Sequence, residues 1–326
     1  MRVVFIGQND WANCANRAAR ALNAHYKEKV ARVLTLNEHP FGYEEDILIS
    51  KEPKGLGGAL QIVQEHLTGA KPNEPTWVFT TGDGSGFSYI GLKRIASKYK
   101  GTLHIGTAYR QNSGLLDGWD KEHEVTCRFI SADSFHLITS PDSSRDYPYI
   151  HSVDIEKSQG LREPSKPLVV HSPSSRASKG THTILEALDE LSDQGFSFDR
   201  VLVEGLDYQA CLKQREKGDI FIGQFNEAIG GYGYSEIEAM AQGMAVISST
   251  HNVDLDCWTN TKVTRSPPIV RGFPYSALVG ELAKMLGKSD YLVEARKDGL
   301  RWIEENATPK AAGAIYADVL ERRSSK

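Results

Sequence analysis

Short apolar runs, each about the length of a strand, alternate along the first half of the chain with longer stretches of mixed polarity. The runs predict strands at Val3–Ile6, Ala31–Leu36, Ile47–Ser50, Trp77–Thr80, Thr102–Ile105 and Phe135–Thr139. The stretches between them predict helices at Trp11–Asn23, Leu60–Leu67 and Ile90–Lys100. Continuous apolar strands that alternate with helices indicate a parallel sheet covered on both faces, as in doubly wound α/β domains.

The alternation weakens over Tyr147–Pro167, a proline-containing stretch without sustained periodicity, which we interpret as a crossover between domains. Beyond it the pattern begins again. Strands are predicted at Leu168–His171, Arg200–Glu204, Asp219–Gly223 and Ala245–Ser248. Helices are predicted at Lys179–Gln194, Tyr208–Lys217, Ser235–Gln242, Tyr275–Leu286 and over most of Asp290–Arg323. The chain should therefore form two Rossmann-like domains, residues 1–160 and 161–326. Packing of the last helix back on the first domain is compatible with this division.

Length and composition narrow the class of protein without indicating a reaction. A chain of 326 residues suits two domains of roughly 150 residues each. The formal net charge of -4 is not that of an obvious nucleic-acid binder, although a local basic groove is compatible with it. The four cysteines form no CxxC pair, so we expect free thiols and no metal site. No apolar run has the length of an export signal core or a membrane span, and we expect a cytoplasmic protein.

The first segment with recognisable chemistry extends from Val169 to Gly180. A strand leads into a loop of small residues that contains two cations three positions apart, Arg176 and Lys179, and a helix follows. Loop amides and a helix N-terminus can face a diphosphate while the two cations neutralise it. The alternative is that both are ordinary surface cations at a strand-to-helix turn.

A second segment, Gly230–Gly243, starts with a glycine-rich loop and continues as a predicted helix. Glycines allow backbone amides to approach a ligand closely, as in other phosphate-binding turns. Glu238 lies about one turn into the helix, on the side of the loop, where it could accept hydrogen bonds from a ribose. The alternative is that Glu236 and Glu238 only favour the positive end of the helix.

Together the two segments resemble glycosyltransferase family 4 over about Leu168 to Ser249. The resemblance rests on Arg176 with Lys179-Gly180, the glycine-rich turn, Glu238–Gly243 and Ala245–Ile247. It implies the GT-B fold, in which two Rossmann-like domains face a central cleft. It also implies transfer with retention of configuration from a nucleotide-diphosphate sugar and no further cofactor. We expect a UDP-sugar, but the motifs do not identify the base or the sugar of the donor.

The resemblance assigns roles to individual residues. Arg176 and Lys179, at a shorter spacing than is usual in the family, would bind the donor diphosphate as catalytic residues, and Glu238 would contact the ribose. The family's first glutamate falls on Gly230, so one contact to the transferred sugar is missing, or is made by backbone amides or by Glu227. The remaining residues of the predicted donor site are Gly7, His171, Ser174, Gly230, Gly231, Tyr232, Gly233, Tyr234 and Ser235.

The N-terminal half supplies weaker candidates, on the acceptor side. They follow predicted strands, where ligands gather in open α/β sheets. These candidates are Asn9, Asp10, Trp11, Asp83 and Arg110. The alternative is a flexible loop for Asp83 and a structural ion pair for Arg110.

We expect sugar transfer to an acceptor hydroxyl without a metal ion, because Arg176, Lys179 and the loop amides can stabilise the leaving diphosphate. The acceptor is left open among a glycan, a protein, a small molecule and a modified base in DNA. Two other functions are compatible with the same motifs. One is a sugar-nucleotide epimerase, for which no acid/base residues can be assigned, and the other is a non-catalytic protein that binds a nucleotide or a nucleic acid.

Overall fold

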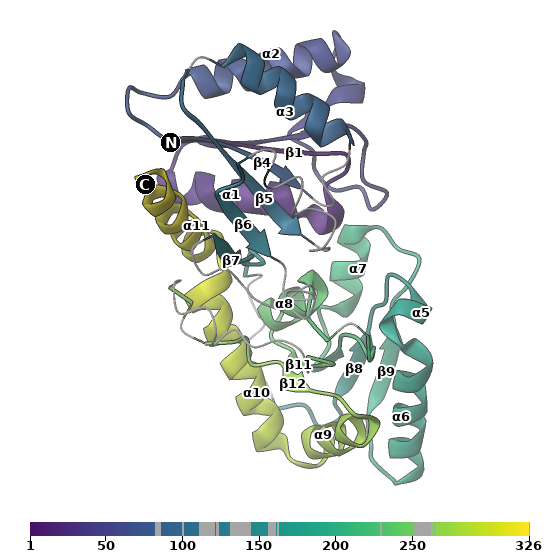
Figure 1. Ribbon diagram of the computed structural model, residues 1–326. Helices are drawn as coiled ribbons and strands as arrows, with labels where there is room; N and C mark the ends of the chain where they lie inside the picture. Colours follow the sequence, from purple (N-terminus) through teal and green to yellow (C-terminus); the bar gives the residue numbers. More distant parts are fainter. Residues whose placement is uncertain are drawn as a thin grey trace. The chain divides into compact units, whose positions relative to one another are not determined.

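The structure, a computed structural model, contains two compact units (Figure 1). The residues that it describes are 1–81, 86–99, 101–110, 121, 124–130, 145–155, 161, 163–228, 230–250, 262–263 and 265–325. Unit 1 contains Met1–Ser152, Asp256–Thr264 and Pro309–Lys326, and unit 2 contains Val153–Leu255 and Arg265–Thr308. The C-terminal helix therefore belongs to the same unit as the N-terminus.

Unit 1 is built on a seven-stranded parallel sheet in the order β3-β2-β1-β4-β5-β6-β7. Its strands are β1 (Arg2–Gly7), β2 (Ala31–Thr35), β3 (Ile47–Leu48), β4 (Thr76–Thr81), β5 (Leu103–Arg110), β6 (Cys127–Ile130) and β7 (Asp146–Pro148). The chain adds strands outward from β1 on one side and then returns to add β4 on the other. Ligands bind at the carboxyl ends of the strands at such a reversal.

Helices cover both faces of this sheet. They are α1 (Cys14–Tyr26), α2 (Gly55–Thr68), α3 (Gly86–Lys98) and α11 (Pro309–Ser324). Figure 1 shows α2 and α3 on one face and α1 beside α11 on the other. Val4 and Ile6 of β1 join the core under α2 and α3, whereas Phe5 stacks on Phe79 on the opposite side. Successive residues of a strand point to opposite faces, which explains why β1 is apolar at consecutive positions.

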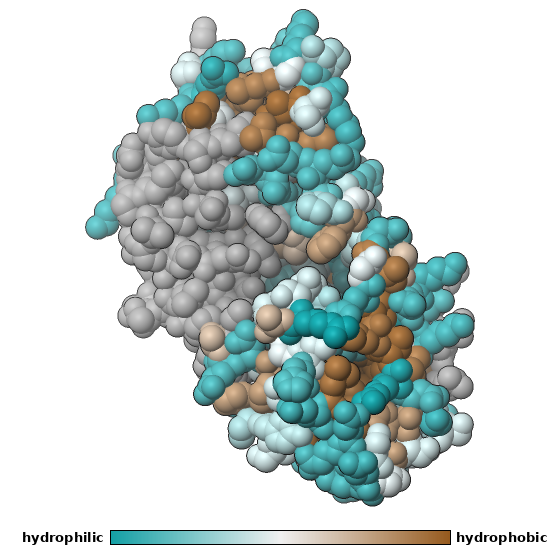
Figure 2. Space-filling model, turned by 90° about the vertical axis from the view of Figure 1, so that its right-hand side faces the viewer, coloured by the Kyte–Doolittle hydropathy of each residue, from teal (hydrophilic) through white to brown (hydrophobic). Residues whose placement is uncertain are grey.

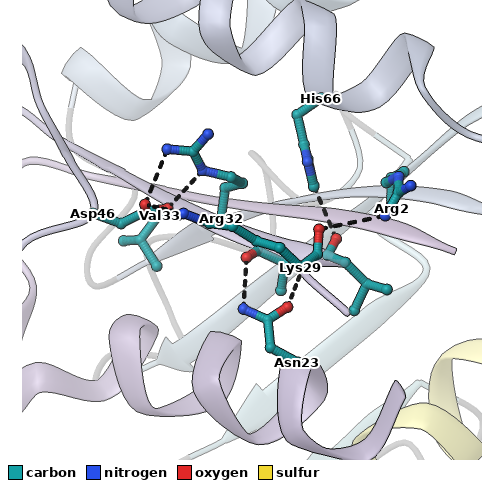
Figure 3. A network of polar contacts seen from close by, with 9 residues as sticks. Arg2, Asn23, Lys29, Arg32, Val33, Asp46 and His66 are labelled. Atoms are coloured by element: carbon teal, nitrogen blue, oxygen red, sulfur yellow. Dashed lines mark hydrogen bonds and ion pairs between the residues drawn. The ribbon is translucent and has the colours of Figure 1, made fainter. Parts of the chain in front are cut away.

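Polar side chains cover the part of β2 that the short strand β3 leaves unpaired (Figure 3). The amide of Asn23 in α1 takes the place of a neighbouring strand: it accepts from the N–H of Ala31 at 2.8 Å and donates to its C=O at 3.0 Å. Asp46 accepts from the N–H of Val33 at 3.0 Å. These backbone groups are therefore satisfied and closed to pairing with another chain.

Unit 2 repeats the architecture on a five-stranded parallel sheet in the order β12-β11-β10-β8-β9. Its strands are β8 (Leu168–His171), β9 (Asp199–Leu202), β10 (Ile220–Ile222), β11 (Ala245–Ser248) and β12 (Val270–Arg271). Its helices are α5 (Arg176–Lys179), α6 (Thr181–Asp193), α7 (Tyr208–Arg215), α8 (Tyr234–Ala241), α9 (Tyr275–Gly287) and α10 (Ser289–Trp302), which a π-helical turn (Ile303–Ala307) follows. Apolar side chains of α6 and α9 pack on the sheet in one core, and α10 contacts β11 and α8.

The predicted doubly wound α/β fold is confirmed, with differences in individual elements. The predictions omitted β6 and β7, because each contains one member of the buried ion pair Arg128–Asp146 and so lacks a continuous apolar run, and they omitted the two-residue strand β12. The helix predicted at Lys179–Gln194 is broken at Gly180, whose φ of 64° separates α5 from α6. The helix predicted from Trp11 begins only at Cys14. The predicted strand Phe135–Thr139 lies outside the described residues.

The surface carries scattered apolar side chains. Figure 2 shows brown apolar areas among hydrophilic ones on the face that it presents. Phe41 in the loop after β2, Ile90 in α3 and Leu206 in the loop after β9 are 42%, 50% and 40% exposed. Within the described parts of the chain, no helix is both long enough and apolar enough to cross a bilayer.

Candidate functional site

The first predicted segment follows β8 in unit 2. Ser175 caps α5 by accepting a hydrogen bond from the N–H of Ser178, and this short helix carries Arg176 and Lys179. The guanidinium of Arg176 donates three hydrogen bonds of 2.6 to 3.1 Å to the carboxylate of Glu204, in the loop after β9. The pairing uses Nε and Nη2, so the guanidinium keeps the N–H groups of Nη1 for a second anion.

Lys179 is linked to the glycine-rich loop through Gln224. The ammonium group donates to Oε1 of Gln224 at 3.0 Å, and Nε2 of Gln224 donates to the C=O of Gly231 at 3.0 Å. Gln224 is buried, and its backbone N–H donates to the hydroxyl of Ser248 at 3.1 Å. The two segments that were recognised separately in the sequence therefore meet at the carboxyl ends of β8 and β10.

The glycine-rich loop leads directly into α8, and Glu236 fixes this junction. The buried carboxylate of Glu236 accepts from the N–H of Gly233 at 3.1 Å and from the hydroxyl of Ser235 at 2.8 Å. Its other oxygen accepts from the hydroxyl of Ser248 at 3.1 Å. Glu236 is thus a helix-capping residue. The predicted loop residues that are buried are Gly230, Gly231, Tyr232 and Tyr234.

Glu238, the predicted ribose contact, is held by two residues of α7. Its Oε1 accepts from the hydroxyl of Tyr208 at 2.7 Å, and its Oε2 pairs with the guanidinium of Arg215. The side chains of Glu238 and Arg215 are 10% and 2% exposed. Both carboxylate oxygens of Glu238 therefore have a partner in α7.

His171 ends β8, but both of its ring nitrogens have protein partners. Nδ1 lies 2.8 Å from the C=O of Ile222, and Nε2 lies 2.9 Å from the hydroxyl of Thr181. Burial lowers the pKa of His171, which favours the neutral ring that donates from Nδ1 and accepts at Nε2. The ring therefore joins β8, β10 and the start of α6. Ser174 is exposed in the loop before α5.

In unit 1, Gly7 of the predicted donor site ends β1, and the acceptor-side candidates Asn9, Asp10 and Trp11 follow it. Gly7 lies so close to Thr81 that a Cβ atom at this position would be 2.1 Å from the threonine hydroxyl. The carboxylate of Asp10 is buried and accepts from the backbone N–H groups of Ala15 and Asn16 at 2.7 and 2.9 Å. Asp10 therefore stabilises the N-terminus of α1, which also satisfies a carboxylate at the positive end of the helix dipole.

Asp10 gives the protein a testable pH dependence. Burial raises the pKa of Asp10 from 3.8 to about 6, although hydrogen bonds with Asn16 and Ala15 lower it. Between these values the folded protein holds a proton that the unfolded chain has released, so the free energy of unfolding falls as the pH rises. We expect Asp10 to contribute a decline of up to about 1.4 kcal/mol per pH unit.

Urea denaturation across roughly pH 4 to 7 measures this contribution. The Asp10→Asn variant should be less stable throughout, because its NH2 group replaces an acceptor that faces the N–H of Asn16. Its decline over the same range should be shallower, since an amide cannot ionise. Equal declines in the two proteins would contradict the role of Asp10.

The remaining acceptor-side candidates are less completely described. Among the described residues, the buried Oδ1 of Asn9 has no hydrogen-bond partner. Trp11 lies in the turn before α1 and Arg110 ends β5, but neither side chain is described. Asp83 lies outside the described residues. No group of three or more His, Cys, Asp or Glu side chains in the described ranges is arranged to hold a metal ion.

Four residues of the site in unit 2 were not predicted. They are Glu204, Tyr208, Arg215 and Gln224. Glu204 and Gln224 stand at the ends of predicted strands, and this position alone is a signal for a ligand site in an α/β sheet. The side chains of Tyr208 and Arg215 carried no such signal, because the sequence does not show that α7 packs against α8.

No family model matches the chain, and no curated protein matches its sequence. Several solved structures do match its fold. A glycosyltransferase from Rickettsia africae aligns over 99% of this chain and 98% of its own, with a TM-score of 0.61 and 12% identity. Anabaena HepE in complex with UDP-glucose aligns over 99% of this chain and 100% of its own, with a TM-score of 0.62 and 10% identity.

An α-glucosyltransferase in complex with UDP-glucose and DNA containing an abasic site aligns over 98% of this chain and 99% of its own. The TM-score is 0.61 and the identity 8%. Likenesses over the whole chain at such low identity establish the architecture, and they confirm the predicted GT-B fold.

Proposed function

We propose that this protein is a glycosyltransferase that moves a sugar from a UDP-sugar to an acceptor hydroxyl with retention of configuration. The observation that carries the proposal is the meeting of two cations, a glycine-rich loop and a paired glutamate at the carboxyl end of one parallel sheet. The hydrogen bonds from Lys179 to Gln224 and from Gln224 to Gly231 connect these parts. Cations and loop amides suit the phosphates of a nucleoside diphosphate, and Glu238 suits its ribose.

The proposed chemistry follows from the charge that develops during transfer. As the bond between the anomeric carbon and the diphosphate breaks, negative charge grows on the departing oxygen. Arg176, Lys179 and the amide of Gly231 would stabilise this charge without a metal ion, whereas the N–H of Gly233 already donates to Glu236. The acceptor hydroxyl would attack from the face that the diphosphate leaves, and a phosphate oxygen would take its proton.

The structural neighbours guide the choice of substrates for a first test. HepE and the α-glucosyltransferase both bind UDP-glucose, which makes it the first donor to assay. The second of these proteins also binds DNA. The acceptor panel should therefore contain a duplex with a hydroxymethylated base, together with oligosaccharides, small alcohols and a protein.

Thermal denaturation with nucleotides tests the donor site. We expect UDP and UDP-glucose, but not ADP, GDP or CMP, to raise Tm. A ligand at about 100 times its Kd adds about 2.7 kcal/mol to the free energy of unfolding. For a protein of 326 residues that is roughly 4 °C. The Arg176→Ala variant should lose most of the increase. Arg200→Ala, which removes another exposed arginine of unit 2 that pairs with an acid, should retain it.

Unchanged melting curves with all nucleotides would overturn the donor assignment. Product analysis then separates the three functions that the sequence left open. Release of UDP together with a glycosylated acceptor supports the transferase. Conversion of a UDP-sugar into its epimer without an acceptor would contradict it in favour of an epimerase. Binding without turnover on the whole panel would indicate a non-catalytic binding protein.

A further inference from the structure

The side chains at both ends of helix α7 contact Glu238. Tyr208 is the first residue of the helix and Arg215 is the last. Seven positions correspond to about two helical turns, so the two side chains lie on one face of α7. One donates its hydroxyl to Oε1 of Glu238 and the other pairs with Oε2, so the carboxylate is fixed at both oxygens.

Arg215 also connects the two segments of the candidate donor site. Its Nε donates at 3.1 Å to Oε1 of Gln242, the residue that follows α8, and its Nη1 donates to the hydroxyl of Ser172 at 3.4 Å. The guanidinium lies 5.5 Å from the centre of the Phe221 ring in β10. Ser172 begins the loop between β8 and α5. The buried side chain of Arg215 therefore contacts both this loop and Glu238, the proposed ribose contact.

Stability alone does not account for this arrangement. Removing two charges from water costs free energy that a close ion pair recovers only in part, and apolar residues of similar volume are often as stabilising. A buried guanidinium does, however, fix the orientation of a carboxylate, because its planar N–H groups point in set directions. We propose that Arg215 and Tyr208 are positioning residues that orient Glu238 toward the ribose hydroxyls of the donor, an inference that rests on the proposed function.

The test compares UDP with 2′,3′-dideoxy-UDP, because only UDP can donate ribose hydroxyls to Glu238. We expect calorimetry to show that the folded wild-type protein binds UDP about tenfold more tightly or better. In Arg215→Met and in Glu238→Gln this ratio should fall to about threefold or less, because the carboxylate is misoriented or absent. Tyr208→Phe removes one hydroxyl from a half-buried residue and should lower the ratio about threefold.

A matched control separates orientation from folding. Arg296 is another buried arginine of unit 2, paired with Asp219 at 3.0 Å. Arg296→Met should also lower Tm, but it should leave the ratio of the two affinities at its wild-type value. If Arg215→Met does not fold, the test uses Tyr208→Phe alone. An unchanged ratio of the two affinities in a folded variant, either Arg215→Met or Tyr208→Phe, overturns the positioning role. Failure of the wild-type protein to bind UDP at all would instead overturn the proposed function.

Discussion

The Gly180→Ala variant should lose about 4 kcal/mol of the free energy of unfolding, together with its ability to bind UDP. Gly180 has a φ of 64°, which alanine adopts only at a cost, and a Cβ atom there would lie 1.9 Å from the carbonyl oxygen of Phe225. The N–H of Phe225 donates to the C=O of Lys179 at 2.9 Å, which holds the loop after β10 in place. Relief of the clash therefore requires movement of Lys179, a proposed ligand of the diphosphate.

Gly195 provides a matched control at the other end of α6. Its φ is 89°, but the space that a Cβ atom would occupy has no atom within 4 Å. Gly195→Ala should therefore cost only the backbone strain, about 1 kcal/mol, and should leave UDP binding unchanged. Urea denaturation and calorimetry with UDP measure the two effects. Equal losses of stability in the two variants would show that the contact with Phe225 is not the cause.

The second large effect is expected in unit 1, where Asp146→Ala should lower the free energy of unfolding by about 4 kcal/mol. Arg128 and Asp146 form a two-point ion pair between β6 and β7, in which Nη2 lies 2.6 Å from Oδ2. Their side chains are 7% and 0% exposed. Removal of the carboxylate leaves the guanidinium of Arg128 buried without its counter-charge, and this desolvation cost dominates the loss.

The exposed pair Lys51–Glu38 in the same unit serves as the control. Its side chains are 64% and 58% exposed, so Glu38→Ala should change stability by less than about 1 kcal/mol. The double variant Arg128→Met/Asp146→Leu should recover much of the loss, since it removes both charges. Chemical denaturation of the four proteins gives the comparison. If Asp146→Ala and Glu38→Ala have similar effects, burial of the pair does not set its contribution.

The fold and the site support the proposed function in different ways. Proteins that share 8 to 12% of their residues with this chain have the same architecture, so the fold by itself does not select a reaction. The site adds chemistry: Arg176 and Lys179 supply positive charge, and a buried amide joins Lys179 to the glycine-rich loop. The proposed reaction class depends on these contacts.

The sequence by itself determined the α/β architecture and the two local motifs that meet in unit 2. Continuous apolar runs, such as Val3–Ile6 in β1 and Leu168–Val170 in β8, have no polar face and must be covered on both sides, which fixes a parallel sheet between layers of helices. The site residues that were predicted in unit 2 belong to local motifs, in which neighbours in the chain act together. Glycines next to a helix start, and cations in a strand-to-helix loop, can be recognised from residues that lie within a dozen positions of one another.

The tertiary structure alone decided what those residues contact. The pairing of Arg176 with Glu204, of Lys179 with Gln224 and of Glu238 with Arg215 joins positions that are 23 to 45 apart in the chain. Asp10 and Glu236 are helix caps in the fold, a role that follows from the backbone groups around them. A local pattern specifies which side a residue faces, but its partner is chosen by the packing of helices and loops against one another, and that packing depends on contacts throughout the unit.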